Sequence, residues 1–128
     1  MEIQWLIPVT RMIDYEGFIS LLGIFHAHDL DVSDVLNITF ATKIRYMPQE
    51  TLEEKELKLT IKQGDIEEVY LFTYPVPSIS KWLDTITYLG IPIQDIKLVN
   101  EGTCEFILSV DESEVSESIL VGHFGGVK

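Results

Sequence analysis

The sequence is poor in cysteine and has no long apolar run. Cys104 is the only cysteine among 128 residues, so an intrachain disulfide is excluded and the fold must rest on its hydrophobic core. No stretch approaches the roughly 18 consecutive apolar residues that a membrane-spanning helix needs. Because the apolar residues 3–9 follow no basic leader, we expect a cytoplasmic protein that does not enter a membrane.

Positive charge is also scarce. The chain has 9 Lys and Arg against 21 Asp and Glu, which leaves a formal net charge of −12. Such a chain repels phosphate backbones and anionic lipid headgroups, so neither direct nucleic-acid binding nor membrane binding is expected. A basic protein surface or a divalent cation is compatible with this charge. Net charge also keeps proteins soluble, which explains the same balance without any partner.

The apolar content is sufficient for one folded domain. Hydrophobic residues make up 46% of the chain and aromatic residues 10%, which argues against intrinsic disorder. The length is typical of a single core, and no linker, repeat or low-complexity segment divides the chain. We therefore expect one domain that covers residues 1–128.

Alternation of apolar and polar residues predicts mainly β-structure. The clearest case is the segment 36–46, where every second residue is suited to a buried face. Residues 57–62 repeat this pattern, and a turn at 63–65 joins them to 69–74 as a hairpin. Two further hairpins are predicted at the ends of the chain, one of residues 3–9 and 18–25 around the turn 14–17, and one of residues 103–110 and 115–121 around 111–114.

Proline and glycine interrupt the pattern after Tyr74. Pro75 and Pro77 end one strand, and Gly90 with Pro92 breaks the next apolar segment, so a short helix or irregular crossover is expected near 79–90. The fold class that follows is all-β, an antiparallel β-sandwich of about seven or eight strands, because two packed sheets bury the inner faces of half-apolar strands. A closed β-barrel is the alternative.

Both ends of the chain resemble a family of uncharacterised bacterial β-sandwich proteins. At the start, the likeness rests on an apolar strand followed by Arg11, the turn 14–17 and the segment 19–25, which contains a Leu-Gly-hydrophobic-Phe element. At the end, it rests on Gly102, a strand that contains Phe106, an acidic turn and a final strand that ends near Val121. The resemblance implies the sandwich fold, and it implies no catalytic residue and no ligand.

One short segment with two histidines and two aspartates is the candidate metal site. In an extended segment, His26 and His28 point to the same side and could offer two imidazoles to a zinc-like ion, with Asp29 or Asp31 as an oxygen ligand. Only His123 and Cys104 are left elsewhere to complete such a site. The competing interpretation is a polar loop in which these residues stabilise turns. A divalent metal is accordingly an alternative, and no cofactor is the main expectation.

Catalytic patterns are missing from the sequence. Cys104 lies in a strand between Glu101 and Glu105, whose charges oppose thiolate formation, so we interpret it as an inert core residue. No serine stands in a nucleophile elbow, and the C-terminal glycines lack the lysine of a phosphate-binding loop. The numerous glutamates are interpreted as solvated surface. We therefore expect that the protein is not an enzyme.

Aromatic residues suggest one partner-binding segment. Tyr70, Phe72 and Tyr74 share one strand face and are expected in the core. Trp82, with Ile79 and Leu83 close by in the crossover, is instead a candidate anchor for another protein, because tryptophan is enriched at interface hot spots.

Three function classes follow from these patterns. The leading hypothesis is a non-enzymatic protein-interaction or assembly module, which includes an acidic regulator or inhibitor that binds a basic protein surface; the partner is another protein or a second copy. The alternatives are a metal-binding enzyme or sensor that uses His26 and His28, and a carbohydrate-binding module that uses exposed aromatic residues such as Trp5, Tyr15 and Tyr88.

Overall fold

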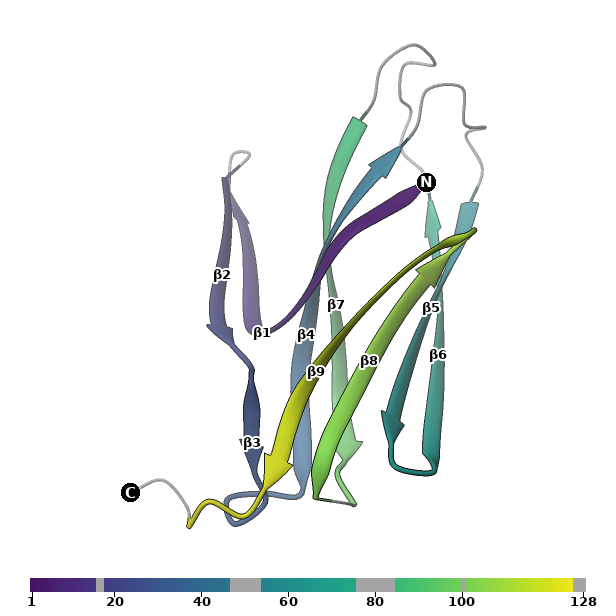
Figure 1. Ribbon diagram of the computed structural model, residues 1–128. Coiled ribbons are helices and arrows are strands. Elements are labelled where there is room, and N and C mark those ends of the chain that lie inside the picture. The colour runs from purple at the N-terminus through teal and green to yellow at the C-terminus, as the bar shows by residue number, and fades with distance from the viewer. Residues whose placement is uncertain (16–17, 47–53, 76–84, 100, 126–128) are drawn as a thin grey trace.

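A computed structural model describes residues 1–15, 18–46, 54–75, 85–99 and 101–125 (Figure 1). These residues form nine β-strands in two sheets that pack face to face, so the expected all-β sandwich is confirmed. No helix among them is long and apolar enough to cross a membrane. The strands are β1 (Glu2–Tyr15), β2 (Phe18–Ile24), β3 (Ala27–Asp29), β4 (Val35–Tyr46), β5 (Glu54–Gln63), β6 (Ile66–Pro75), β7 (Thr85–Lys97), β8 (Gly102–Val110) and β9 (Ser113–Gly122).

The two sheets differ in size and in one strand direction. The four-stranded sheet has the order β2-β1-β4-β7 and all its neighbours are antiparallel. The five-stranded sheet has the order β3-β9-β8-β5-β6, and in it the short strand β3 runs parallel to β9. This parallel pair departs from the expected antiparallel sandwich, because the chain crosses from one sheet to the other between β2 and β3. Both sheets keep open edges, so the described strands do not form the alternative closed barrel.

Strand β7 corrects the prediction of a helix or irregular crossover near 79–90. It begins at Thr85 and pairs with β4 without a break at Gly90 or Pro92, so that prediction is wrong for residues 85–90. Residues 79–84 lie outside the described residues. Proline is tolerated in β7 because this strand is a sheet edge, where one side of the backbone has no ladder to interrupt. With β7 and β3, the strand count exceeds the expected number.

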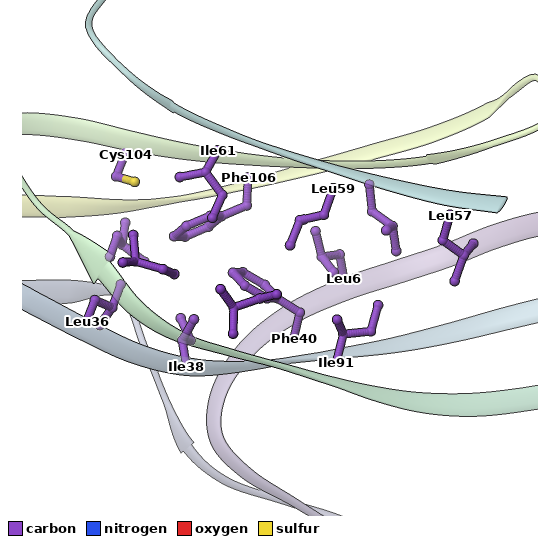
Figure 2. Packing of buried hydrophobic residues seen from close by; sticks show 14 of the residues in the cluster. Leu6, Leu36, Ile38, Phe40, Leu57, Leu59, Ile61, Ile91, Cys104 and Phe106 are labelled. Atoms are coloured by element: carbon purple, nitrogen blue, oxygen red, sulfur yellow. The ribbon is translucent and has the colours of Figure 1, made fainter. Parts of the chain in front are cut away.

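The core lies between the sheets and draws on alternate residues of their inner faces. Phe40 of β4 and Phe106 of β8 come from opposite sheets and meet edge to face, with ring centroids 4.8 Å apart (Figure 2). Leu59 and Ile61 of β5 and Ile38 of β4 pack around this pair and are almost completely buried. Each such side chain contributes about 1.5–3 kcal/mol of burial free energy. Three aromatic residues of β6 pack against the same core, as expected: Tyr70, Phe72 and Tyr74.

Strand β1 serves two different partners along its length. Residues 2–9 pair with β4 inside the sandwich, Val9 pairs with both β4 and β2, and residues 11–15 pair with β2 only. The predicted N-terminal hairpin is confirmed, although β1 continues to Tyr15 instead of ending near Val9. We call residues 10–15 and 18–24 the arm. Figure 1 shows that β1 changes direction about midway and that the arm stands beside the other strands.

Candidate functional site

The base of the arm is a tight backbone contact that requires glycine. Gly23 adopts a φ of 66°, a left-handed conformation that other residues rarely adopt. The Thr10 hydroxyl donates a hydrogen bond of 3.2 Å to the Gly23 carbonyl, and a Cβ at position 23 would overlap the Thr10 side chain. The Phe25 amide donates to the Pro8 carbonyl at 2.9 Å. Gly23 therefore fixes where the arm leaves the sandwich.

The inner face of the arm rests on the outer face of the four-stranded sheet. Met12 pairs directly with Leu21 across the arm, and both side chains are half-buried. The Met12 side chain lies 3.4 Å from the point where a Cβ of Gly90 would stand. Ala41, which pairs with Gly90, is completely buried although alternation from Phe40 puts it on the outer face. Met12 thus lies over Gly90, at a distance where even a Cβ would make an ordinary van der Waals contact.

The opposite face of the arm is mainly apolar and open to solvent, and it also includes the exposed Arg11 and Ser20. Tyr15 and Phe18 stand directly opposite each other near its tip and are 68% and 75% exposed. Leu22, which alternation places on the same face as Phe18, is 48% exposed, and Ile24 at the base is 58% exposed. Single exposed hydrophobic residues are ordinary, whereas neighbouring ones on one element are typical of an interaction surface.

The arm is electrically neutral within a strongly acidic chain. Its described residues include Arg11 and Asp14 as the only charged side chains, and β2 has none. The whole chain carries −12, so most of the acidic residues lie outside the arm, although Glu16 stands in the sequence between its two strands. An approaching molecule therefore meets several apolar side chains on the outer face of the arm, with Arg11 as the charged side chain beside them.

Strand β2 also differs from the other described sheet edges. Natural sheets block their edges with charges, prolines or very short strands. Edge strand β7 has Pro92 and Asp95, β6 has Glu67 and Glu68, and β3 is only three residues long. Strand β2 has seven residues with no charge and no proline. Among the edges of the described sheets, β2 is therefore the one without a charge, a proline or a very short strand to block another strand.

The predicted metal residues lie at the end of the sandwich where β3 meets β9. The His26 side chain is exposed, and its backbone carbonyl accepts a hydrogen bond from the Leu120 amide. His28 instead points its Nε2 at the Ser33 carbonyl, 2.7 Å away, so its ring already has a partner within the loop. Only the His28 ring is seen to contact the loop, and this contact agrees with the interpretation that His28 stabilises a polar loop.

The two aspartates of this motif hold the chain that follows β9. Asp29 Oδ1 accepts hydrogen bonds from the Asp31 amide at 2.9 Å and the Phe124 amide at 3.1 Å. Asp31 accepts from His123 Nδ1 at 2.7 Å and from the Gly125 amide at 2.8 Å. We call this set of contacts the clasp. The sequence placed the aspartates in a metal site and did not foresee this fastening of residues 123–125.

Charge strengthens the clasp at His123. Its Nε2 lies 3.1 Å from Glu101 Oε1, on the side away from Asp31. The hydrogen bond to Asp31 raises the pKa of His123 above its ordinary value, and the same bond, with that of the Gly125 amide, lowers the pKa of Asp31. Among the described side chains, no group of three or more His, Cys, Asp or Glu is arranged to hold a metal ion. The metal site at His26, His28, Asp29 and Asp31 stays a prediction.

Cys104 is a core residue, as its sequence context indicates. It is almost fully buried on β8, and burial raises the pKa of its thiol to about 11, with a smaller effect of Glu68. The acid that acts on it is thus Glu68 of β6 and not Glu101 or Glu105. At neutral pH the thiol is protonated, which makes it a poor nucleophile.

Two of the aromatic residues named for the carbohydrate-binding alternative, Trp5 and Tyr88, lie together, and that alternative stays a prediction. Trp5 and Tyr88 meet on the outer face of the four-stranded sheet, but their rings are tilted by 47° with centroids 6.0 Å apart. Lys43 Nζ lies 5.9 Å from the Tyr88 ring centre. The predicted partner-binding residues, Trp82 with Ile79 and Leu83, lie outside the described residues, so their role stays a prediction.

Two hollows accompany these surfaces. An apolar groove of about 300 Å³ opens between β6 and β7, the edges on one side of the sandwich, and is lined mainly by Leu57, Phe72, Tyr74, Leu89, Ile91 and Pro92. A smaller one of about 200 Å³ lies where the arm leaves the sheet, beside Thr10 and Thr39. Neither contains a charged side chain in its lining.

No protein-family model, curated protein or solved structure matches this chain. The resemblance to uncharacterised bacterial sandwich proteins therefore stays a prediction. The feature that sequence reasoning missed is the arm as a surface of its own. Its signal was present in the segment Phe18–Ile24, which has no charged residue in a chain where 23% of residues are charged.

Proposed function

We propose that this protein is a non-enzymatic protein-interaction module and that the arm is its docking element. The observation that carries this proposal is the solvent-exposed apolar face of the arm, formed by Tyr15, Phe18, Leu22 and Ile24. Burial of such side chains against a partner yields about 25 cal/mol for each Å² removed from water. An aromatic pair at the tip suits the centre of an interface, where a few large residues supply most of the binding free energy.

The way the arm is held supports a docking role. Its inner face is fixed on the sheet through Met12, and its base is fixed by Gly23 and Thr10. A surface that is already ordered loses less conformational entropy when it binds than a disordered one. The arm therefore presents its outer face in a defined position before any partner arrives.

The proposal is tested by cross-linking with mass spectrometry, using a photoreactive group at Ser20, which is exposed on β2. We expect a protein cross-linked to the arm that disappears in the Tyr15→Ser/Phe18→Ser variant. The matched control is Leu71→Ser on edge strand β6, which removes a side chain that is 59% exposed and should leave the cross-link intact. The proposal is wrong if every protein contact, including contact with a second copy, survives the arm substitutions.

A further inference from the structure

We propose that the partner of the arm is a second copy of this chain, and that two β2 strands pair edge to edge across a two-fold axis. This inference rests on the proposed function and names its partner. Strand β2 pairs with β1 on one side only, and its other side lies at the edge of the four-stranded sheet. Pairing of two such edges joins the arms of two molecules into one four-stranded sheet.

Charge favours a second copy at this place. Two chains that each carry −12 repel each other over most of their surface. Strand β2 is the exception, because it has no charged side chain. An apolar contact between uncharged β2 strands brings no acidic side chain of β2 into the interface. Such a surface gives a basic partner no attraction, whereas it removes the main obstacle to self-association.

The sequence of β2 is complementary to itself in the antiparallel direction. With the two-fold axis at Leu21, that residue lies beside Leu21 of the second copy, and Phe18 lies beside Ile24 of the second copy. Ser20 then stands beside Leu22 of the second copy, and Ile19 beside Gly23, whose left-handed φ of 66° and hydrogen bond from Thr10 end the regular ladder there. Large apolar side chains meet at the centre and at both ends, and no like charges are opposed, which is the pattern that stabilises neighbouring strands.

The inference is tested by sedimentation equilibrium of the intact protein. The interface is short, below about 1,200 Å², so association is expected over roughly micromolar to millimolar concentrations. Across that range the weight-average mass should rise from 14.6 kDa toward twice this value. Added salt should strengthen the association, because it screens the repulsion between the acidic bodies. A wild-type protein that remains monomeric throughout overturns the inference.

Charged variants of β2 identify the pairing itself. Ser20→Lys/Leu22→Lys places lysines opposite lysines across the axis and should weaken association by at least about tenfold. Ser20→Glu/Leu22→Glu should do the same, whereas a mixture of the two variants should form a heterodimer. Leu71→Lys on β6 is the matched control and should associate like the wild type. If the doubly substituted chains remain folded and still associate with themselves, the contact lies elsewhere and the inference is wrong.

The two proposals fail in different ways. A monomeric protein whose arm still cross-links to a different protein overturns the second-copy inference and leaves the interaction module intact. A dimer that depends on β2 supports both. A protein that neither self-associates nor cross-links through the arm contradicts both.

Discussion

The arm and the sandwich body are made of similar residues but are held together by different means. In the body, Phe106 packs against Phe40 and is completely buried. In the arm, Phe18 is among the most exposed hydrophobic residues described. Both stand in strands of apolar and polar residues with good β-propensity. The difference teaches that a strand's apolar content sets how much surface it can bury, while the position of the strand in the sheet decides whether that surface is buried within the molecule.

The same substitution in both regions should separate them most clearly. Phe106→Ala should lower the free energy of unfolding by about 3–5 kcal/mol, because it leaves a cavity between the sheets. Phe18→Ala should change it by less than about 0.5 kcal/mol, since that ring is already in water. Urea unfolding in the Ser20→Lys/Leu22→Lys background measures both without a contribution from association. If Phe18→Ala lowered the free energy of unfolding as much as Phe106→Ala, the Phe18 ring would belong to the core.

A buried polar contact in the body offers the next largest effect. Gln63 of β5 donates from Nε2 to the Lys97 carbonyl at 2.9 Å and accepts from the Val99 amide at 3.1 Å, so it fastens the end of β7 to the other sheet. Gln63→Leu should cost about 2 kcal/mol of unfolding free energy, because both backbone groups lose this partner. Gln94→Leu, at an exposed glutamine of β7, is the control and should be nearly neutral in the same urea measurement. Equal effects would refute the role of the contact.

At the base of the arm, Gly23→Ala should loosen the arm and leave the body folded. The new Cβ meets the Thr10 side chain, and the left-handed backbone adds about 1–2 kcal/mol. Hydrogen exchange should then become faster at Ile13 and Ser20, a hydrogen-bonded pair of the arm, and remain slow at Phe40. Gly102→Ala is the control, since Gly102 also has a positive φ, of 120°, but has open space around its Cβ position. If Gly23→Ala leaves hydrogen exchange in the arm unchanged, the contact between Gly23 and Thr10 does not hold the arm in place.

The clasp should respond to pH, with a smaller and local effect. Asp31 has a lowered pKa, so its contribution is present above the ordinary aspartate value of 3.8 and is lost as the pH falls through the lowered value. His123 has a raised pKa, so its contribution is fully present below the ordinary value of 6.5 and is lost as the pH rises through the raised value. The clasp should therefore be tightest between these two ordinary values.

Amide chemical shifts and hydrogen exchange at Phe124 and Gly125 measure this window. His123→Gln should remove the loss on the alkaline side, because glutamine does not titrate, while the loss on the acidic side through Asp31 should remain. His26→Gln, at an exposed histidine outside the clasp, should leave the profile unchanged. An alkaline loss that persists in His123→Gln would assign the titration to another group.

Several features of the fold were determined by the sequence alone. Alternation over residues 36–46 defined β4 with its buried face, and turn residues located the hairpins β5–β6 and β8–β9. These signals are local, since a period of two residues and a turn act over a few neighbours. The burial of Cys104 followed from its place in such a strand.

Other features were decided only by the tertiary structure. Alternation shows which side of a strand is apolar, but it does not show which strand lies beside it. Hence β7 could carry Gly90 and Pro92 because it became an edge strand covered by Met12, and Asp31 found His123 through the parallel pairing of β3 with β9. The segment Phe18–Ile24 is an apolar strand of the predicted hairpin, yet β1 bends away from β4 at Val9 and leaves this strand at an edge. Exposure is a property of sheet order, which contacts distant in sequence determine.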